Sequence, residues 1–138
     1  MTAPSRVNAL RYAMIGTGVI CSFLLFPLTR LWPGGWSWGM GASHYLPMIL
    51  VVYFVLGISL IFASRDPVGN RALVWFTIWS NVAHSAVMAF QSTTDPAEVG
   101  HFFGDIPALL IVALVLAILL KRATIPAEIV AEYARRSA

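Results

Sequence analysis

The chain has 138 residues, of which 59% are hydrophobic and only 11% are charged. Soluble domains carry about 25% charged residues, so this composition excludes an ordinary soluble domain and predicts an integral membrane protein. The single cysteine, Cys21, excludes an intramolecular disulfide and, with it, the membrane thiol oxidoreductases that depend on cysteine pairs. Basic residues that flank membrane spans explain the net charge of +3, so nucleic acid is not expected as a partner.

Long apolar runs separated by short polar segments predict an all-α fold, a four-transmembrane-helix bundle that forms a single domain over residues 1–138. The spans are expected at about residues 10–30, 44–64, 71–92 and 105–121. The first run is longer than the core of a signal peptide and lacks a small-residue cleavage site, so it is interpreted as a retained helix. Gly18 and Ser22 in this run form a small-xxx-small pair that permits close contact with another helix.

The first loop is rich in tryptophan and glycine. Its residues Trp32, Trp36 and Trp38 are typical of an aromatic belt at the membrane interface, and the alternative is a lid over a ligand site. Helix-capping side chains are expected further along the chain at Ser43, Asn70, Asp95 and Asp105. After the fourth span, apolar residues repeat at helical spacing and predict an amphipathic surface helix at about residues 125–136.

The third span, Arg71 to Gln91, carries a row of polar side chains on an otherwise apolar helix. At 100° per residue, one side of this helix collects Thr77, Asn81, His84, Ser85, Met88 and Gln91. The opposite side collects Trp75, Trp79, Ala86 and Phe90. Unpaired polar groups are costly in hydrocarbon, so His84 is expected to face the second or the fourth span rather than lipid.

The basic residues predict the orientation. With four spans, eight of the nine Lys and Arg residues fall on one side of the membrane and Arg30 alone falls on the other. The positive-inside rule then predicts a multi-pass protein of the bacterial inner (plasma) membrane with both termini in the cytoplasm. In this orientation all three histidines belong to the outer half of the protein.

A candidate site follows from that placement. The outer half could bring together His44, His84, His101, Asp105, Asn81 and Gln91, and imidazole and carboxylate groups are ligands for Zn, Cu or Fe. A haem would need two histidines, with His44 and His84 as the best-placed pair. The spacing signal is weak because no HxxxH, HxH or ExxH pair lies on one helix. Asp105, as an N-cap, is not expected to share a helical face with His101.

Three roles stay open for these residues. The metal ligands would be His44, His84, His101 and Asp105. A ligand-binding or catalytic pocket would use Asn81, His84, Gln91, His44 and His101, with His84 as the candidate acid or base. In the structural alternative, His84 is neutral and hydrogen-bonded inside the bundle.

Several functions are disfavoured. The chain has no Gly-rich phosphate loop and no GxSxG elbow, which disfavours nucleotide-binding proteins and hydrolases. No acidic residue falls in the middle of a span, which disfavours a proton-coupled drug exporter of similar size.

The segment from Leu56 to Gln91 carries a recognisable pattern. It reads Ala-x-Arg-x-Pro, then Asn-Arg-x-Leu, then Trp-Ser-x-x-x-His-x-x-x-Met-x-x-Gln, with the matches at Ala63, Arg65, Pro67, Asn70, Arg71, Leu73, Trp79, Ser80, His84, Met88 and Gln91. The segment resembles the core of an uncharacterised family of small bacterial four-helix integral membrane proteins. The resemblance implies four spans and brings no known activity or cofactor.

Two functions therefore remain. The first is an accessory or binding subunit of a larger membrane assembly, with a polar pocket near the outer leaflet, because 138 residues show no recognisable catalytic set. The alternative is a membrane enzyme or carrier for a lipid-like or apolar small molecule, with or without a His-ligated metal or haem. The expected partners are the lipid bilayer, other membrane subunits or further copies of the chain, and a lipid-like ligand.

Overall fold

The computed structural model describes residues 3–38 and 44–125, and the chain is all-α in these ranges. The elements are α1 (Ala3–Val19), the π-helical turn η1 (Ile20–Leu24), α2 (Leu25–Leu31), α3 (Pro33–Trp36), α4 (Tyr45–Ala63), α5 (Arg71–Thr94), the 3-10 helix η3 (Pro96–Phe102) and α6 (Asp105–Thr124). Ser43 lies outside the described residues. The predicted surface helix at about residues 125–136 also lies outside them, except for Ile125.

Among the described residues, four segments are long and apolar enough to cross a membrane, as the sequence predicts. They are Pro4–Leu31, Tyr45–Ala63, Arg71–Thr94 and Pro96–Thr124. The first segment begins before the expected residue 10 because α1 continues through Arg6 and Arg11 without interruption. The chain is a multi-pass membrane protein built as a bundle of four helices.

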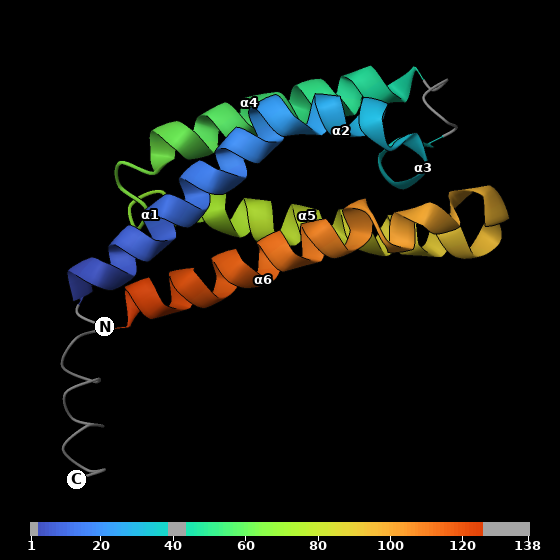
Figure 1. Cartoon of the computed structure of the whole chain (residues 1–138). Coiled ribbons are helices and arrows are strands. Elements are labelled where there is room, and N and C mark those ends of the chain that lie inside the picture. Colours follow the sequence, from blue (N-terminus) through green and yellow to red (C-terminus); the bar gives the residue numbers. More distant parts are fainter. Residues whose placement is uncertain (1–2, 39–43, 126–138) are drawn as a thin grey trace, which may run out of the picture.

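The helices pack in an order that differs from their order in the sequence. α1 contacts α4 on one side and α6 on the other, and α5 lies along α6 (Figure 1). α4 and α5 follow one another in the chain, yet they share few contacts. The bundle therefore has an open seam between α4 and α5.

The two ends of the bundle carry opposite charge. The start of α1, the turn between α4 and α5, and the end of α6 gather at one end (Figure 1). This basic end holds Arg6, Arg11, Arg65, Arg71, Lys121 and Arg122, with Asp66 as the acidic residue among them. The acidic end, where α3 meets η3, holds Asp95, Glu98 and Asp105, with Arg30 as its basic residue in the described ranges.

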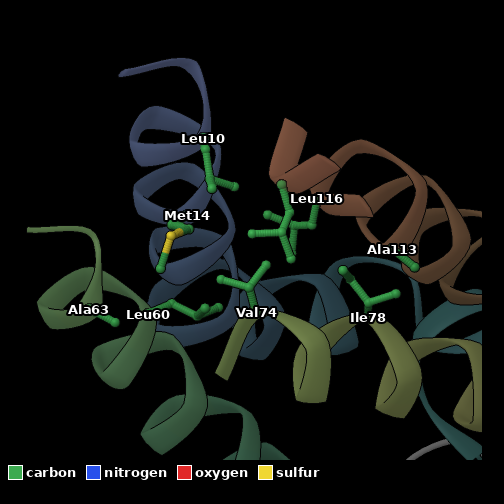
Figure 2. Packing of buried hydrophobic residues seen from close by; sticks show 9 residues of the cluster. Leu10, Met14, Leu60, Ala63, Val74, Ile78, Ala113 and Leu116 are labelled. Atoms are coloured by element: carbon green, nitrogen blue, oxygen red, sulfur yellow. The ribbon is translucent and has the colours of Figure 1, made fainter. Parts of the chain in front are cut away.

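The apolar core fills the half of the bundle near the basic end. Its buried residues are Leu10, Met14, Leu60, Ala63, Val74, Ile78, Ala113, Leu116 and Leu120 (Figure 2). Side chains from α1, α4, α5 and α6 meet there, so all four spans are held together in this half. The half near the acidic end holds the buried polar residues Glu98 and His101.

A close crossing of α1–η1 with α4 holds the first two spans together. A Cβ on Gly57 would lie 2.6 Å from the Gly18 carbonyl oxygen and would also collide with Ser22 Oγ. The Ser22 hydroxyl donates a hydrogen bond to the Phe54 carbonyl oxygen at 3.3 Å. The small-residue pair Gly18 and Ser22 therefore serves packing within the chain.

The π-helical turn η1 has a local cause. Pro27 lacks a backbone N–H and cannot donate to the carbonyl four residues earlier, at Phe23. Just before this proline, the Leu25 N–H donates to the Ile20 carbonyl, five residues back. The helix widens there and continues, so α1, η1 and α2 form one rod.

The expected caps are met in part. The Asp95 carboxylate accepts a hydrogen bond from the Ala97 N–H at 3.0 Å, as a capping side chain should. Asn70 occupies the N-cap position of α5, but its side chain donates to the Asp66 carbonyl and makes no capping bond. The expectation that Asp105 caps α6 is wrong, because Gly104 occupies the N-cap and Asp105 is the first residue of the helix.

Candidate functional site

Helix α5 is two-sided, as its sequence predicts. Thr77, Asn81, Ser85 and Met88 are buried, and His84 is half-buried. The opposite side exposes its large aromatic side chains, Trp75, Trp79 and Phe90. Gln91 differs from the expectation that the whole stripe turns inward, since its side chain is exposed near the acidic end.

A cavity of about 680 Å³ lies in the seam between α4 and α5. We call it the seam cavity, and its lining residues are Trp38, Tyr45, Leu46, Ile49, Ser80, Ala83, His84, Val87, Met88 and Gln91. Tyr45, Ala83 and Val87 are exposed, so the cavity opens sideways, on the face that meets lipid. It exists because α4 and α5 share few contacts with each other.

The lining of the seam cavity is mostly apolar and uncharged. None of its ten described residues is Lys, Arg, Asp or Glu. Ser80, His84 and Gln91 supply polar groups from α5, and Tyr45 supplies a hydroxyl from the start of α4. The Ser80 hydroxyl already donates to the Thr77 carbonyl at 3.2 Å, which leaves its oxygen as an acceptor.

A second, smaller cavity of about 80 Å³ lies deeper in the bundle. We call it the inner chamber, and its lining residues are Leu25, Thr29, Trp36, Trp38, Leu46, Ile49, Leu50, Tyr53, His84, Met88, Asp105 and Leu109. His84 lines both cavities, and its Nδ1 lies 3.4 Å from the Tyr53 hydroxyl. Tyr53 engages one ring nitrogen, which leaves Nε2 as the nitrogen for a ligand.

The acidic end holds a compact cluster of three titratable side chains. Nδ1 of His101 lies 2.9 Å from both carboxylate oxygens of Asp105, and Nε2 lies 3.1 Å from Oε2 of Glu98. His101 is fully buried. Both ring nitrogens can donate only when the imidazole carries both protons, so the geometry fits an imidazolium between two carboxylates. Trp38 stacks on the same imidazole, with ring centroids 4.4 Å apart.

Close backbone packing holds this cluster in place. A Cβ on Gly100 would lie 2.2 Å from the Gly34 carbonyl oxygen, and a Cβ on Gly104 would lie 2.1 Å from that of Gly35. Only glycine therefore allows the α3 backbone to rest on the η3–α6 junction. The described part of the tryptophan-rich loop, residues 31–38, therefore packs on the acidic end of the bundle.

His101 and Asp105 lie on different helices, in η3 and at the start of α6, yet their side chains meet. The sequence analysis took Asp105 as an N-cap that shares no helical face with His101, and it did not predict this contact. The chain instead runs from η3 through a short turn into α6, so the end of one helix and the start of the next lie side by side. Glu98, which the sequence analysis did not place in the site, completes the cluster at a spacing of three residues from His101.

The three histidines do not converge. His84 lines the seam cavity, His101 lies in the cluster with its carboxylates, and His44 is exposed at the start of α4 and lines neither cavity. Asp105 is the link between the regions, since it contacts His101 and also lines the inner chamber with His84. Asn81 lines neither cavity, and its buried Oδ1 has no hydrogen-bond partner among the described residues.

The described residues contain no group of three or more His, Cys, Asp or Glu side chains that could hold a metal ion. The proposed haem pair of His44 and His84 also finds no shared cavity there. Sequence reasoning passed over Tyr53 as a site residue. Its signal was a phenolic hydroxyl near the middle of the mostly apolar second span.

Comparison with known proteins places the chain in a family. The model of the Family of unknown function (DUF6632) matches residues 2–135. The chain belongs to this family. No curated protein and no solved structure matches the chain. The match covers nearly the whole sequence, so all four spans, the seam cavity and the acidic-end cluster lie within the family region.

Proposed function

We propose that the protein is a membrane-embedded binding subunit whose seam cavity takes an uncharged amphipathic molecule from the bilayer. The observation that carries this proposal is a lateral cavity of about 680 Å³ in which polar groups converge on an otherwise apolar lining. Small-molecule sites are typically concave, mostly apolar and fitted with a few polar groups that fix orientation.

The chemistry of the lining selects the class of ligand. Leu46, Ile49 and Val87 offer an apolar surface for a hydrocarbon body. His84 and Gln91 offer a donor or acceptor to a carbonyl or hydroxyl head. No described lining residue carries a fixed charge, so a charged head would lose its hydration without gaining a partner. A lipid-like molecule with a neutral polar head meets both conditions.

The remaining parts of the proposal concern setting and chemistry. The protein lies in a bacterial inner membrane with both termini in the cytoplasm. This orientation puts the seam cavity near the outer leaflet. The subunit delivers or presents its ligand to a larger membrane assembly. If the bound molecule is instead transformed, His84 is the group placed to act as acid or base, because its ring reaches both cavities.

The test compares two alanines on α5 that are both exposed. Ala83 lines the seam cavity and Ala86 does not. Wild type, Ala83→Trp and Ala86→Trp are extracted with their surrounding lipid in polymer-bounded discs, and the bound lipids are measured by mass spectrometry. We expect wild type and Ala86→Trp to be enriched in one neutral amphiphile over the bulk membrane. Ala83→Trp should reduce that enrichment about tenfold, the effect of losing about 1.4 kcal/mol of binding free energy.

The same experiment can contradict the proposal. Equal lipid composition in all three samples would mean that the seam cavity holds only bulk lipid. Equal depletion in Ala83→Trp and Ala86→Trp would mean that a bulky residue anywhere on this helix disturbs the bundle. Either result would remove the support for a specific ligand.

A further inference from the structure

A separate groove lies at the basic end of the bundle, away from the seam cavity. It has a volume of about 470 Å³ and runs between the first turn of α5 and the last turns of α6. Arg71 and Trp75 line it from α5, and Ile118, Leu120 and Lys121 line it from α6. The groove therefore joins two cationic side chains to an apolar floor.

Within the part of the chain that the structure describes, the fold does not engage these two cations. Arg71 and Lys121 are exposed, and within residues 3–38 and 44–125 neither side chain has an acidic partner or a hydrogen bond. Other arginines of this end are engaged. Arg11 donates to the main-chain carbonyls of Ser64 and Arg65, and the Arg65 guanidinium lies over the Phe62 ring.

The apolar part of the groove is preformed. Trp75 lies one turn along α5 from Arg71, so the two side chains share a face. The Trp75 ring stacks on Trp79 with ring centroids 6.4 Å apart, which holds the groove wall in place. Leu120 is buried at the floor, and Ile118 is 41% exposed along the groove.

We propose that this groove binds an anionic phospholipid, with the phosphate between Arg71 and Lys121 and an acyl chain along Ile118. Arginine and lysine are the side chains that bind phosphate oxygens most strongly, and arginine does so through two parallel hydrogen bonds. Basic pockets between spanning helices are a recurrent site for acidic lipid heads. A zwitterionic lipid fits less well, because its own cationic group would meet two further positive charges.

This inference does not depend on the seam cavity. The groove lies at the opposite end of the bundle, and its ligand carries a charge that the seam cavity has no described group to neutralise. A failure of one proposal therefore leaves the other standing.

The test uses native mass spectrometry of the full chain in mild detergent, titrated with phosphatidylglycerol or phosphatidylcholine. The groove variant is Arg71→Gln with Lys121→Gln. The matched control is Arg65→Gln with Arg122→Gln, which removes the same charge from the same end but touches no residue of the groove. We expect wild type and control to bind phosphatidylglycerol more tightly than phosphatidylcholine. The groove variant should bind it about tenfold more weakly or worse.

A second pair of variants leaves the charge unchanged. Ile118→Trp fills the groove, whereas Ile111→Trp places the same ring at another exposed position of α6 that does not line it. We expect Ile118→Trp alone to lose the tight phosphatidylglycerol adduct. This pair still decides the question if the double charge variant proves unstable.

Three results would overturn the inference. Equal loss in the groove variant and its charge control would mean that only the net charge of the basic end matters. A wild-type protein that binds the two lipids equally would have no acidic-lipid site. Full competition by inorganic phosphate would mean that the groove takes a free anion, and a lipid site predicts that inorganic phosphate leaves the adduct in place.

Discussion

The indole ring of Trp38 lies stacked on the imidazole of His101, with ring centroids 4.4 Å apart and ring planes 11° apart. Trp38 also lines both the seam cavity and the inner chamber. The position of this ring is therefore set by the carboxylate–histidine cluster on one side, and it shapes the candidate ligand site on the other. A substitution that disrupts the cluster should therefore change the shape of both cavities.

The first prediction tests the cluster. His101→Leu removes the shared partner of Glu98 and Asp105 and leaves the Asp105 carboxylate without its imidazole. Loss of one member of a buried charge pair is expected to reduce the free energy of unfolding by about 3–5 kcal/mol. The measurement is unfolding in mixed micelles of mild detergent and dodecyl sulfate. The control is His44→Leu, at an exposed histidine of the same end, which should stay close to wild type.

The second prediction concerns the pair of Tyr53 and His84, whose polar atoms lie 3.4 Å apart inside the membrane span. His84→Leu should reduce the free energy of unfolding by about 1–3 kcal/mol, because it leaves the Tyr53 hydroxyl without its hydrogen-bond partner. His84→Gln should cost less, since an amide offers both a donor and an acceptor. Tyr53→Phe in the His84→Leu background should then cost little more.

The double variant Tyr53→Phe/His84→Leu completes a double-mutant cycle for this pair and decides whether the two side chains interact. Full additivity of Tyr53→Phe and His84→Leu would show that the two side chains do not interact. If His84 instead handles a proton or ligates a metal, His84→Gln should fold normally but lose that activity or that metal.

The third prediction tests the crossing of the first two spans. Gly57→Ala places a Cβ 2.6 Å from the Gly18 carbonyl oxygen, so α1 and α4 must move apart. Overpacking of this kind is expected to cost about 1–3 kcal/mol. Gly16→Ala is the control, since a Cβ there meets nothing within 4 Å and alanine favours a helix. Equal stability of the two variants would contradict the close crossing.

The fourth prediction concerns orientation. Among the described residues, the basic end holds Arg6, Arg11, Arg65, Arg71, Lys121 and Arg122. The positive-inside rule predicts that this end faces the cytoplasm. A fluorescent protein fused after Ala138 should be bright, and alkaline phosphatase fused at the same residue should be inactive. Phosphatase activity there would reverse the orientation and move the histidines to the cytoplasmic half.

The sequence alone was sufficient for the class, the four spans and the two-sided third helix. These features follow from local composition and periodicity, because a bilayer demands long apolar helices and turns a polar stripe such as that of Thr77, Asn81 and Ser85 inward. The same logic predicted that Trp75 and Trp79 face outward. The charge asymmetry of the loops is likewise a property of the sequence, and it reappears as the basic and acidic ends.

Only the tertiary structure decided which polar groups meet. The sequence grouped His44, His84 and His101 because all three fall in one half of the protein. Helix rotation and crossing separate them, since a side chain reaches only a few ångströms and one turn of a helix changes its neighbours. Likewise, the meeting of His101 with Asp105 depends on how η3 turns into α6. The seam cavity depends on the arrangement of α4 and α5, which share few contacts with each other.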